Sequence, residues 1–394
     1  MILLKIVQNV ELVLLQMQNK KFKIFIIAGE VSGDVLGARI MHEMKDVQFV
    51  GIGGENMIRN GLKSLFPMSD LAVMGVIEVV AHARTLTKRI KQTVDAIIKE
   101  QPDVVLTIDS PGFARNVISR VRKLPAGQRL IANGMRFHHI VAPQVWAWRP
   151  KRAKKYARTF DKLYAFFDFE LPYFTKYGLD TVAVGHPISD GLIGKSAKSA
   201  GGGKIITLLP GSRMSEVSRL MPVFRDVVDI LSRDTVNKYK YVIPTVETTR
   251  DYIADCVSKW RVPVQLVDSG KRYDLYAKTY IAIAASGTVS AELAMMHVPA
   301  VIVYRMNPIT VWLARRVINI RWVSLVNILL NRSVYPELLG GDATAENIVR
   351  EFAKLTLPEQ RHKMIQDLSM ADNMWRRDNG APAKIIANDL RNLK

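Results

Sequence analysis

Asp109 follows a strongly apolar run in the segment TIDSPGF, residues 107–113. A run of this kind predicts a buried strand, and ligands of open α/β sheets bind just beyond the carboxyl ends of such strands. In that position a carboxylate can act as a general base that takes a proton from a hydroxyl nucleophile. The alternative is an aspartate that only forms a turn or caps a helix before Ser110 and Pro111. Asp109 is therefore the candidate catalytic residue.

A glycine-bearing turn, AGEVSGD at residues 28–34, follows the first apolar run after residue 21. Its two glycines permit a tight turn into a helix, whose free N–H groups bind anions and sugar hydroxyls. We expect Glu30, Ser32, Gly33 and Asp34 to bind a substrate here. In the alternative interpretation, Ser32 and Asp34 only cap the helix.

A second turn of this type, LLPGSR at residues 208–213, lies in the other half of the chain. Gly211 and Ser212 present backbone N–H groups at a helix start, and Arg213 adds a forked charge suited to a diphosphate. No Gly-Lys-Ser/Thr follows at the spacing of a Walker A loop. The turn is a candidate phosphate site of another kind.

The segment ASGTVSAELA, residues 285–294, gives the most specific indication of a ligand-binding site. An apolar run ends at Ser286, Gly287 and Thr288, and a helix with free N–H groups for phosphate is expected to begin at once. Glu292 lies about one turn further, where a carboxylate can bind a ribose diol. A capping box without any ligand is the alternative.

Residues 293–336 contain no acidic residue but combine arginines with tryptophans. An amphipathic segment of this type is typical of an interfacial helix. We expect Trp312, Arg315, Arg316 and Trp322 to lie at a membrane surface, and a dimer contact or core packing is the alternative. A second basic stretch, APQVWAWRPKRAKKYAR at 142–158, fits an anionic surface, nucleic acid or an ordinary solvated helix face.

The composition is that of a globular protein, with 48% hydrophobic and 23% charged residues, and Cys256 is the single cysteine. A disordered chain and an internal disulfide framework are therefore excluded. With 56 lysines and arginines against 36 acids, the formal charge is +20. A charge of this size favours an anionic partner, and the composition leaves nucleic acid, anionic lipid and a phosphorylated substrate open.

The chain has no HExxH, no HxxxH, no cysteine pair and no GxSxG. These motifs hold zinc or mark covalent nucleophiles in many enzymes. We therefore expect no metal and no other cofactor.

The candidate residues need a scaffold that brings strand ends together. From residue 22 onward, short apolar runs alternate with helix-length amphipathic stretches. Continuous apolar strands between helices predict parallel sheets covered on both faces. The expected fold class is α/β, with two Rossmann-like domains whose parallel sheets face a central cleft.

The small, flexible segment GKSAKSAGGG interrupts this alternation and predicts a linker. We divide the chain into an N-terminal extension (1–21), a first domain (22–193), the linker (194–203), a second domain (204–365) and a C-terminal helical segment (366–394). Residues 1–16 are interpreted as a dispensable extension ahead of an alternative start at Met17, and an amphipathic membrane-surface helix is the alternative. No run approaches the roughly 20 apolar residues that a spanning helix needs.

These stretches together resemble one known family, the lipid-A-disaccharide synthases. The matching stretches follow the family's order from residue 22 to about 340, and AGEVSGD and QVWAWR are specific to it. They are AGEVSGDVLGARI (28–40), FVGIGG (49–54), LAVMGVIEVV (71–80), TIDSPGF (107–113), APQVWAWRPKR (142–152), VGHPI (184–188), LLPGSR (208–213), ASGTVSAELA (285–294), YRMNPITVWLARR (304–316) and PELL (336–339).

The resemblance implies a GT-B glycosyltransferase that transfers 2,3-diacylglucosamine from its UDP conjugate to 2,3-diacylglucosamine 1-phosphate (lipid X), with inversion to a β-1,6 link. It implies that Asp109 is the base on the acceptor hydroxyl, that the 28–34 turn binds the acceptor, and that Arg213 and Glu292 bind the nucleotide. It further implies a cytoplasmic enzyme, docked on the anionic inner-membrane surface, that needs no nucleic acid and is compatible with a homodimer.

The chain departs from the family's pattern at three positions. Gly112 stands where a second acid is common, Val326 where a proline is frequent, and Gly340 where a glutamine often follows PELL. The Gly112 change removes any carboxylate role shared with Asp109 there, and the Gly340 change bears on acceptor or nucleotide contacts of its loop. None of the three removes Asp109, Arg213 or Glu292.

Other functions fit parts of the sequence. A UDP-GlcNAc-using glycosyltransferase of peptidoglycan synthesis and a sugar 2-epimerase share the expected fold, but AGEVSGD and QVWAWR argue against both. A non-catalytic protein that binds nucleic acid or an anionic membrane would use the +20 charge. A nicotinamide-dependent enzyme lacks its GxGxxG fingerprint here.

Overall fold

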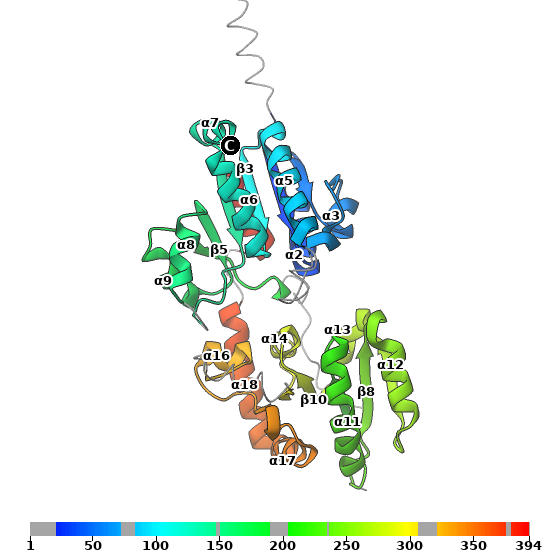
Figure 1. Cartoon of the computed structure of the whole chain (residues 1–394). Helices are drawn as coiled ribbons and strands as arrows, with labels where there is room; N and C mark the ends of the chain where they lie inside the picture. Colours follow the sequence, from blue (N-terminus) through cyan, green and yellow to red (C-terminus); the bar gives the residue numbers. More distant parts are fainter. Residues whose placement is uncertain are drawn as a thin grey trace, which may run out of the picture. The chain divides into compact units, whose positions relative to one another are not determined.

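The computed structural model describes residues 21–71, 83–146, 150–189, 204–234, 236–305, 321–375 and 380–393 (Figure 1). The chain divides into two compact units, one formed by Met1–Pro187 with Asp378–Lys394 and the other by Ile188–Arg377. Each unit contains one six-stranded sheet, and the neighbouring strands within it are parallel. The predicted α/β class with two Rossmann-like sheets is thereby confirmed. Residues 1–20 of the predicted extension and the predicted linker lie outside the described residues.

The sheet of the first unit has the strand order β2-β1-β3-β4-β5-β6. Its strands are β1 (Lys23–Ala28), β2 (Gln48–Ile52), β3 (Val104–Ile108), β4 (Arg136–Ile140), β5 (Lys162–Ala165) and β6 (Asp180–Ala183). The strand order reverses between β1 and β3, because β2 lies on one side of β1 and the later strands lie on the other. Ligands of such sheets bind at this switch point, beyond the carboxyl ends of the two strands. The loops that leave β1 and β3 there carry the 28–34 turn and Asp109.

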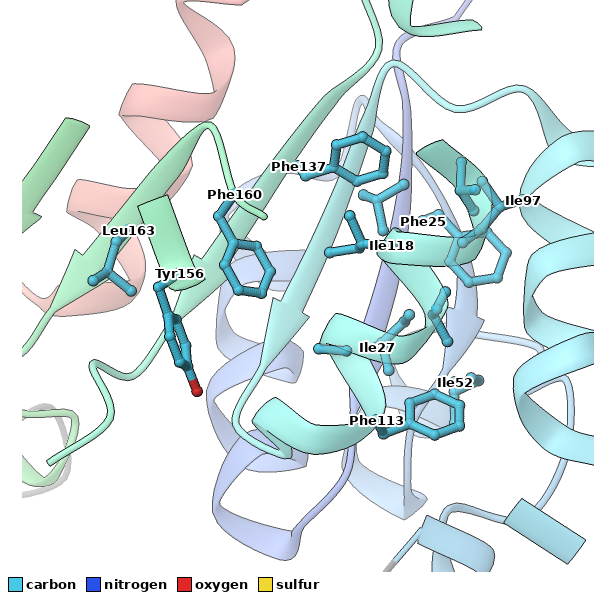
Figure 2. Packing of buried hydrophobic residues seen from close by; sticks show 14 of the residues in the cluster. Phe25, Ile27, Ile52, Ile97, Phe113, Ile118, Phe137, Tyr156, Phe160 and Leu163 are labelled. Carbon is cyan, nitrogen blue, oxygen red and sulfur yellow. The ribbon is translucent and has the colours of Figure 1, made fainter. Parts of the chain in front are cut away.

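Helices cover both faces of this sheet, as the continuous apolar runs of its strands require. Phe25 and Ile27 of β1 pack into one apolar cluster with Ile97, Phe113 and Ile118, which lie on helices that cover this face (Figure 2). Ile24 of the same strand packs into a second cluster on the opposite face. The helices of the unit are α2 (Val31–Glu43), α3 (Glu55–Arg59), α5 (Ala83–Glu100), α6 (Pro111–Lys123), α7 (Pro125–Ala132), α8 (Ala153–Ala157), α9 (Leu171–Thr175) and α19 (Pro382–Arg391).

The sheet of the second unit repeats this arrangement, with the strand order β12-β11-β10-β7-β8-β9. Its strands are β7 (Ile205–Leu209), β8 (Lys240–Thr245), β9 (Val264–Asp268), β10 (Thr279–Ala285), β11 (Ala300–Tyr304) and β12 (Glu337–Leu339). Its helices are α11 (Met214–Leu231), α12 (Glu247–Ser258), α13 (Arg272–Tyr276), α14 (Thr288–Met295), α16 (Leu325–Leu330), α17 (Ala345–Thr356) and α18 (Pro358–Trp375). Here the order reverses between β7 and β10. The predicted phosphate turns 208–213 and 285–288 leave these two strands at that switch point.

The C-terminal stretch 366–394 contributes to both units. Helix α18 ends at Trp375, whose side chain is fully buried within the second unit. Helix α19 packs against α2 in the first unit and buries Ala383, Ile386 and Leu390 in its second apolar cluster. The end of the chain therefore completes the core of the unit in which the described chain begins.

Candidate functional site

The backbone around Asp109 is strained at the ends of two adjacent strands. Asp109 and Ser110, directly after β3, have φ angles of 55° and 45°, and Val141, directly after β4, has a φ of 83°. A left-handed conformation costs a non-glycine residue about 1–3 kcal/mol and is worst for a β-branched one. The N–H of Asp109 donates to the carbonyl oxygen of Ile140 at 3.1 Å, which joins the two strained segments. Strain of this kind persists where a site depends on the position of its side chains.

The carboxyl group of Asp109 is partly buried. This burial raises the pKa of the Asp109 carboxyl, and the hydrogen bond that it accepts from the Ser110 N–H at 2.8 Å opposes the increase. A raised pKa makes a carboxylate a stronger proton acceptor. The direction of this shift agrees with the predicted role of Asp109 as a general base, and that role stays a prediction.

Tyr156 of α8 lies within electrostatic reach of Asp109. Burial raises the pKa of the Tyr156 phenol to about 12, Arg152 and Arg115 act to lower it, and the Asp109 carboxylate adds to the increase. The Tyr156 side chain is fully buried, and its hydroxyl has no hydrogen-bond partner among the described residues. Figure 2 shows the oxygen at the tip of the ring, pointing away from the apolar cluster. Tyr156 is thus a buried hydroxyl within electrostatic reach of Asp109 that sequence reasoning did not single out.

The 28–34 turn leads directly into α2. Glu30 is the N-cap position of the helix, so Ser32 and Asp34 lie in its first turn instead of capping it. Ser32 is exposed and Gly33 is buried. A Cβ at position 33 would lie 3.3 Å from Cγ2 of Ile108, so glycine allows α2 to approach the strand that precedes Asp109.

Asp34 holds a second loop. Its carboxylate accepts hydrogen bonds from the backbone N–H groups of Gly54 (2.8 Å), Asn56 (2.9 Å) and Met57 (3.0 Å), and from the Asn56 side-chain amide (2.9 Å). The side chain is 2% exposed. These four donors fill the acceptor capacity of a carboxylate. Asp34 therefore joins the 28–34 turn to the glycine turn after β2, and its predicted contact with substrate stays a prediction.

A cavity of about 430 Å³ opens at the switch point of the second sheet. A volume of this size is in the range of small-molecule sites. The cavity unites the two turns that sequence analysis proposed for phosphate. Its lining contains the predicted residues Gly211, Ser212, Arg213, Ser286, Gly287 and Glu292, together with Arg272, Tyr276, Glu216, Ser269, Pro244 and Val246. The backbone of Thr288 begins α14, and its side chain lies outside the described part of the structure.

The turn after β7 places a glycine and an arginine at the start of a helix. Gly211 has a φ of 105°, and a Cβ there would lie 2.5 Å from Oε2 of Glu216. Arg213 is the N-cap residue of α11, and its guanidinium lies 3.3 Å from Oε1 of Glu216. The positive end of this long helix and the Arg213 charge are thus presented to the cavity together.

Glu292 is held by a network that the sequence did not predict. The Arg272 guanidinium contacts both carboxylate oxygens, with Nε 3.2 Å from each and Nη2 3.1 Å from Oε1. The hydroxyls of Tyr273 and Tyr276 donate to the same carboxylate at 3.0 and 3.5 Å. Glu292 thus lies in the cavity, as predicted, with a charged partner from α13.

The predicted membrane-surface residues can be placed only in part. Trp312, Arg315 and Arg316 lie outside the described residues. Trp322 is partly buried, and the Arg321 guanidinium lies 5.0 Å from the centre of its ring.

The structure describes all three positions at which the chain departs from the family's pattern. Gly112 is exposed and a Cβ there would meet nothing within 4 Å. Val326 is fully buried in α16. Gly340 has a φ of 63° directly after β12, a conformation that suits glycine.

Comparisons with known proteins identify relatives in sequence and in fold. A lipid-A-disaccharide synthase of Rhodospirillum centenum is 39% identical over 394 aligned residues, which cover 95% of each chain. The UDP-GlcNAc 2-epimerase from Neisseria meningitidis, solved with bound UDP-GlcNAc, matches with a TM-score of 0.63 and 13% identity over 94% of this chain and 100% of that one. The glycotransferase of kitacinnamycin matches with a TM-score of 0.63 and 10% identity over 95% and 99%.

The two structural likenesses concern the fold alone, and the fold is of the GT-B type. The family model for lipid-A-disaccharide synthetase matches residues 24–379, nearly the whole described chain. The chain belongs to the lipid-A-disaccharide synthase family.

Proposed function

We propose that this chain condenses UDP-2,3-diacylglucosamine with 2,3-diacylglucosamine 1-phosphate (lipid X) to give the lipid A disaccharide 1-phosphate and UDP. The observation that carries the proposal is the cavity at the second switch point, where Arg213, Glu292 and the start of α14 meet. Family membership adds support, because the Rhodospirillum centenum relative bears the name of this enzyme over nearly its full length.

In the proposed mechanism, Asp109 is the general base. Its carboxylate takes the proton of the acceptor 6-hydroxyl while that oxygen forms a bond to the anomeric carbon of the donor sugar. The bond from that carbon to the UDP oxygen breaks on the opposite face, and UDP leaves with the electron pair. A single displacement inverts the anomeric centre, which accounts for a β link.

The negative charge that develops on UDP needs preorganised positive groups. Arg213 lines the cavity, and α14 begins at Thr288, directly after Gly287. Free N–H groups at a helix start bind phosphate oxygens. These groups stabilise the leaving diphosphate in the proposed mechanism, and Glu292 binds the ribose.

Both substrates carry acyl chains, so we propose that the protein docks on the anionic surface of the inner membrane. Among the described residues, no helix combines the length and the apolar character needed to cross a bilayer. The formal charge of +20 supports attraction to an anionic surface. Trp322, with Arg321 against its ring, is the described residue among the four proposed to make this contact.

The test is a detergent-micelle assay with UDP-2,3-diacylglucosamine and radiolabelled lipid X. Wild type should form the disaccharide phosphate with EDTA present, and Asp109→Asn should lose at least about 10²-fold in kcat, as expected for a general base. Asp255→Ala, which removes an exposed carboxylate paired with Lys259, serves as the matched control and should keep full activity. A folded wild type without product would overturn the proposed activity, whereas a fully active Asp109→Asn would overturn the role of Asp109 alone.

A further inference from the structure

The Glu292 carboxylate has no acceptor capacity left for a ribose diol. A carboxylate offers about four lone-pair positions, and Arg272, Tyr273 and Tyr276 direct four donor groups at it. These are Nε and Nη2 of Arg272 and the two phenolic hydroxyls, at 3.0–3.5 Å. A ribose bound to Glu292 therefore has to displace some of these donors.

The side chains that contact Glu292 differ in their exposure, and therefore in how easily a ligand can displace them. Tyr276 is 1% exposed, and its ring is part of the core. Arg272 is 34% exposed and lines the cavity. Apart from Glu292, its guanidinium contacts the Ser269 carbonyl oxygen at 3.1 Å and the Tyr273 hydroxyl at 3.0 Å. Arg272 is thus the partner that a ligand can move.

The charges that line the cavity are balanced. Arg213 pairs with Glu216 at 3.3 Å, and Arg272 pairs with Glu292 at 3.1 Å. All four side chains line the cavity, and no further charged side chain among the residues that the structure describes lines it. Beyond the N–H groups at the helix starts, a diphosphate therefore finds a cationic side chain among the described residues only where an arginine turns from its glutamate to the ligand. Leaving Glu292 without a cation would be costly, because an unpaired buried carboxylate is destabilising.

We propose that Arg272 is a second diphosphate-binding arginine. When the ribose diol binds Glu292, the Arg272 guanidinium leaves this carboxylate and binds the nucleotide diphosphate instead. The proposal rests on the proposed function, because it assigns the cavity to a nucleoside diphosphate. The two halves of the ligand then act together: the ribose releases Arg272, and the diphosphate gives it a new partner. A nucleoside without phosphates has to separate the pair with no compensation, so the cavity selects against it.

The test compares UDP with uridine, each titrated into wild type, Arg272→Gln and Arg272→Lys by calorimetry, with ligand-observed NMR for weak binding. Arg272→Gln should weaken UDP binding roughly 10- to 100-fold, the loss expected for a hydrogen bond to a charged group. Uridine should bind this variant as well as it binds wild type, or better, because Glu292 is released. Arg272→Lys keeps the charge without the fork and should give an intermediate loss for UDP.

A purely structural role of Arg272 makes a different prediction. If Arg272 only holds Glu292 in place, the affinities for UDP and uridine should fall by the same factor, and this result would overturn the proposal. Unchanged UDP binding in both variants would overturn it as well. Arg225→Gln is the matched control, because this exposed arginine of α11 pairs with Asp226 away from the cavity lining, and it should change neither affinity.

The titration uses no acceptor, so it is independent of the disaccharide assay. A wild type that binds UDP with the expected dependence on Arg272 but forms no disaccharide overturns the proposed function only. If wild type forms disaccharide but the ratio of the UDP and uridine affinities is the same in wild type and the Arg272 variants, only this inference is overturned.

Discussion

The phenol of Tyr164 donates a hydrogen bond of 2.6 Å to Oδ2 of Asp389, 225 residues further along the chain. The other oxygen of this carboxylate accepts from Lys162 Nζ at 2.7 Å. Tyr164 and Lys162 lie on β5, and Asp389 lies on α19. One carboxylate therefore fastens the last helix to the sheet of the first unit, beside the apolar contacts of α19.

Asp389→Ala should destabilise the first unit. The substitution leaves the phenol of Tyr164, a fully buried side chain, without this acceptor, and leaves Lys162 with Asp180 at 3.2 Å. The loss of a buried partner costs about 1–3 kcal/mol, to be measured by urea unfolding. Lys384→Ala removes an exposed side chain of the same helix and should stay close to wild type. Equal stability of the two variants would contradict the role of the carboxylate.

A second prediction separates scaffold from substrate contact in the 28–34 turn. Asp34→Ala deprives three backbone N–H groups of their acceptor, so it should lose at least about 2 kcal/mol of unfolding free energy. Ser32→Ala changes an exposed side chain in the same turn and should keep full stability. If Ser32 binds the acceptor, as predicted, this variant should raise KM for lipid X in the disaccharide assay. A stable Asp34→Ala would contradict the scaffold role.

The third prediction concerns the pH dependence of catalysis. A general base has to be ionised, so kcat/KM should rise with pH through the pKa of Asp109, which burial raises above 3.8. Asp109→Asn cannot titrate, and its residual activity should lack this acidic limb. The profile is measured where circular dichroism reports the native fold. An acidic limb that persists in Asp109→Asn would assign it to another group.

Much of the site follows from local sequence. Continuous apolar runs predicted the strands, and glycine-bearing turns at their ends predicted the loops, because both signals depend on neighbouring residues alone. The turns at 208–213 and 285–288, which are predicted to bind phosphate, line one cavity as a consequence of parallel strand order. The rule that ligands bind beyond strand ends was sufficient to find them.

Other features depend on contacts between distant segments. Arg272 begins a five-residue helix, and it meets Glu292 only because α13 packs beside the switch point. The three-residue β12 is too short for its pattern to be read from sequence, and it pairs with β11 at the edge of the sheet. The return of α19 to the first unit has no local signal either, since its apolar face fits any apolar surface.

The last prediction concerns Glu170, a glutamate that is 5% exposed. Burial raises the pKa of its carboxyl to about 7, although the N–H groups of Phe166 and Phe167 donate to Oε2 at 3.1 Å and act in the opposite direction. A folded-state pKa above the ordinary value of 4.5 favours the protonated form in the native protein. The resulting stability is fully present below pH 4.5 and is lost as the pH rises through about 7.

Glu170→Gln should remove this loss, because the amide oxygen can accept the same two backbone hydrogen bonds without becoming charged. The free energy of unfolding of the variant should therefore exceed that of wild type at pH 8, and the difference should shrink as the pH falls below 7. Burial lowers the pKa of His138 and His186 to about 4 and that of His139 to about 3. These histidines destabilise the fold as the pH falls from about 6.5, but they are common to both proteins and cancel in the difference. Glu43→Gln, an exposed glutamate of α2, is the control. A wild type that is more stable than Glu170→Gln at pH 8 would mean that the ionised carboxylate contributes favourably to the fold.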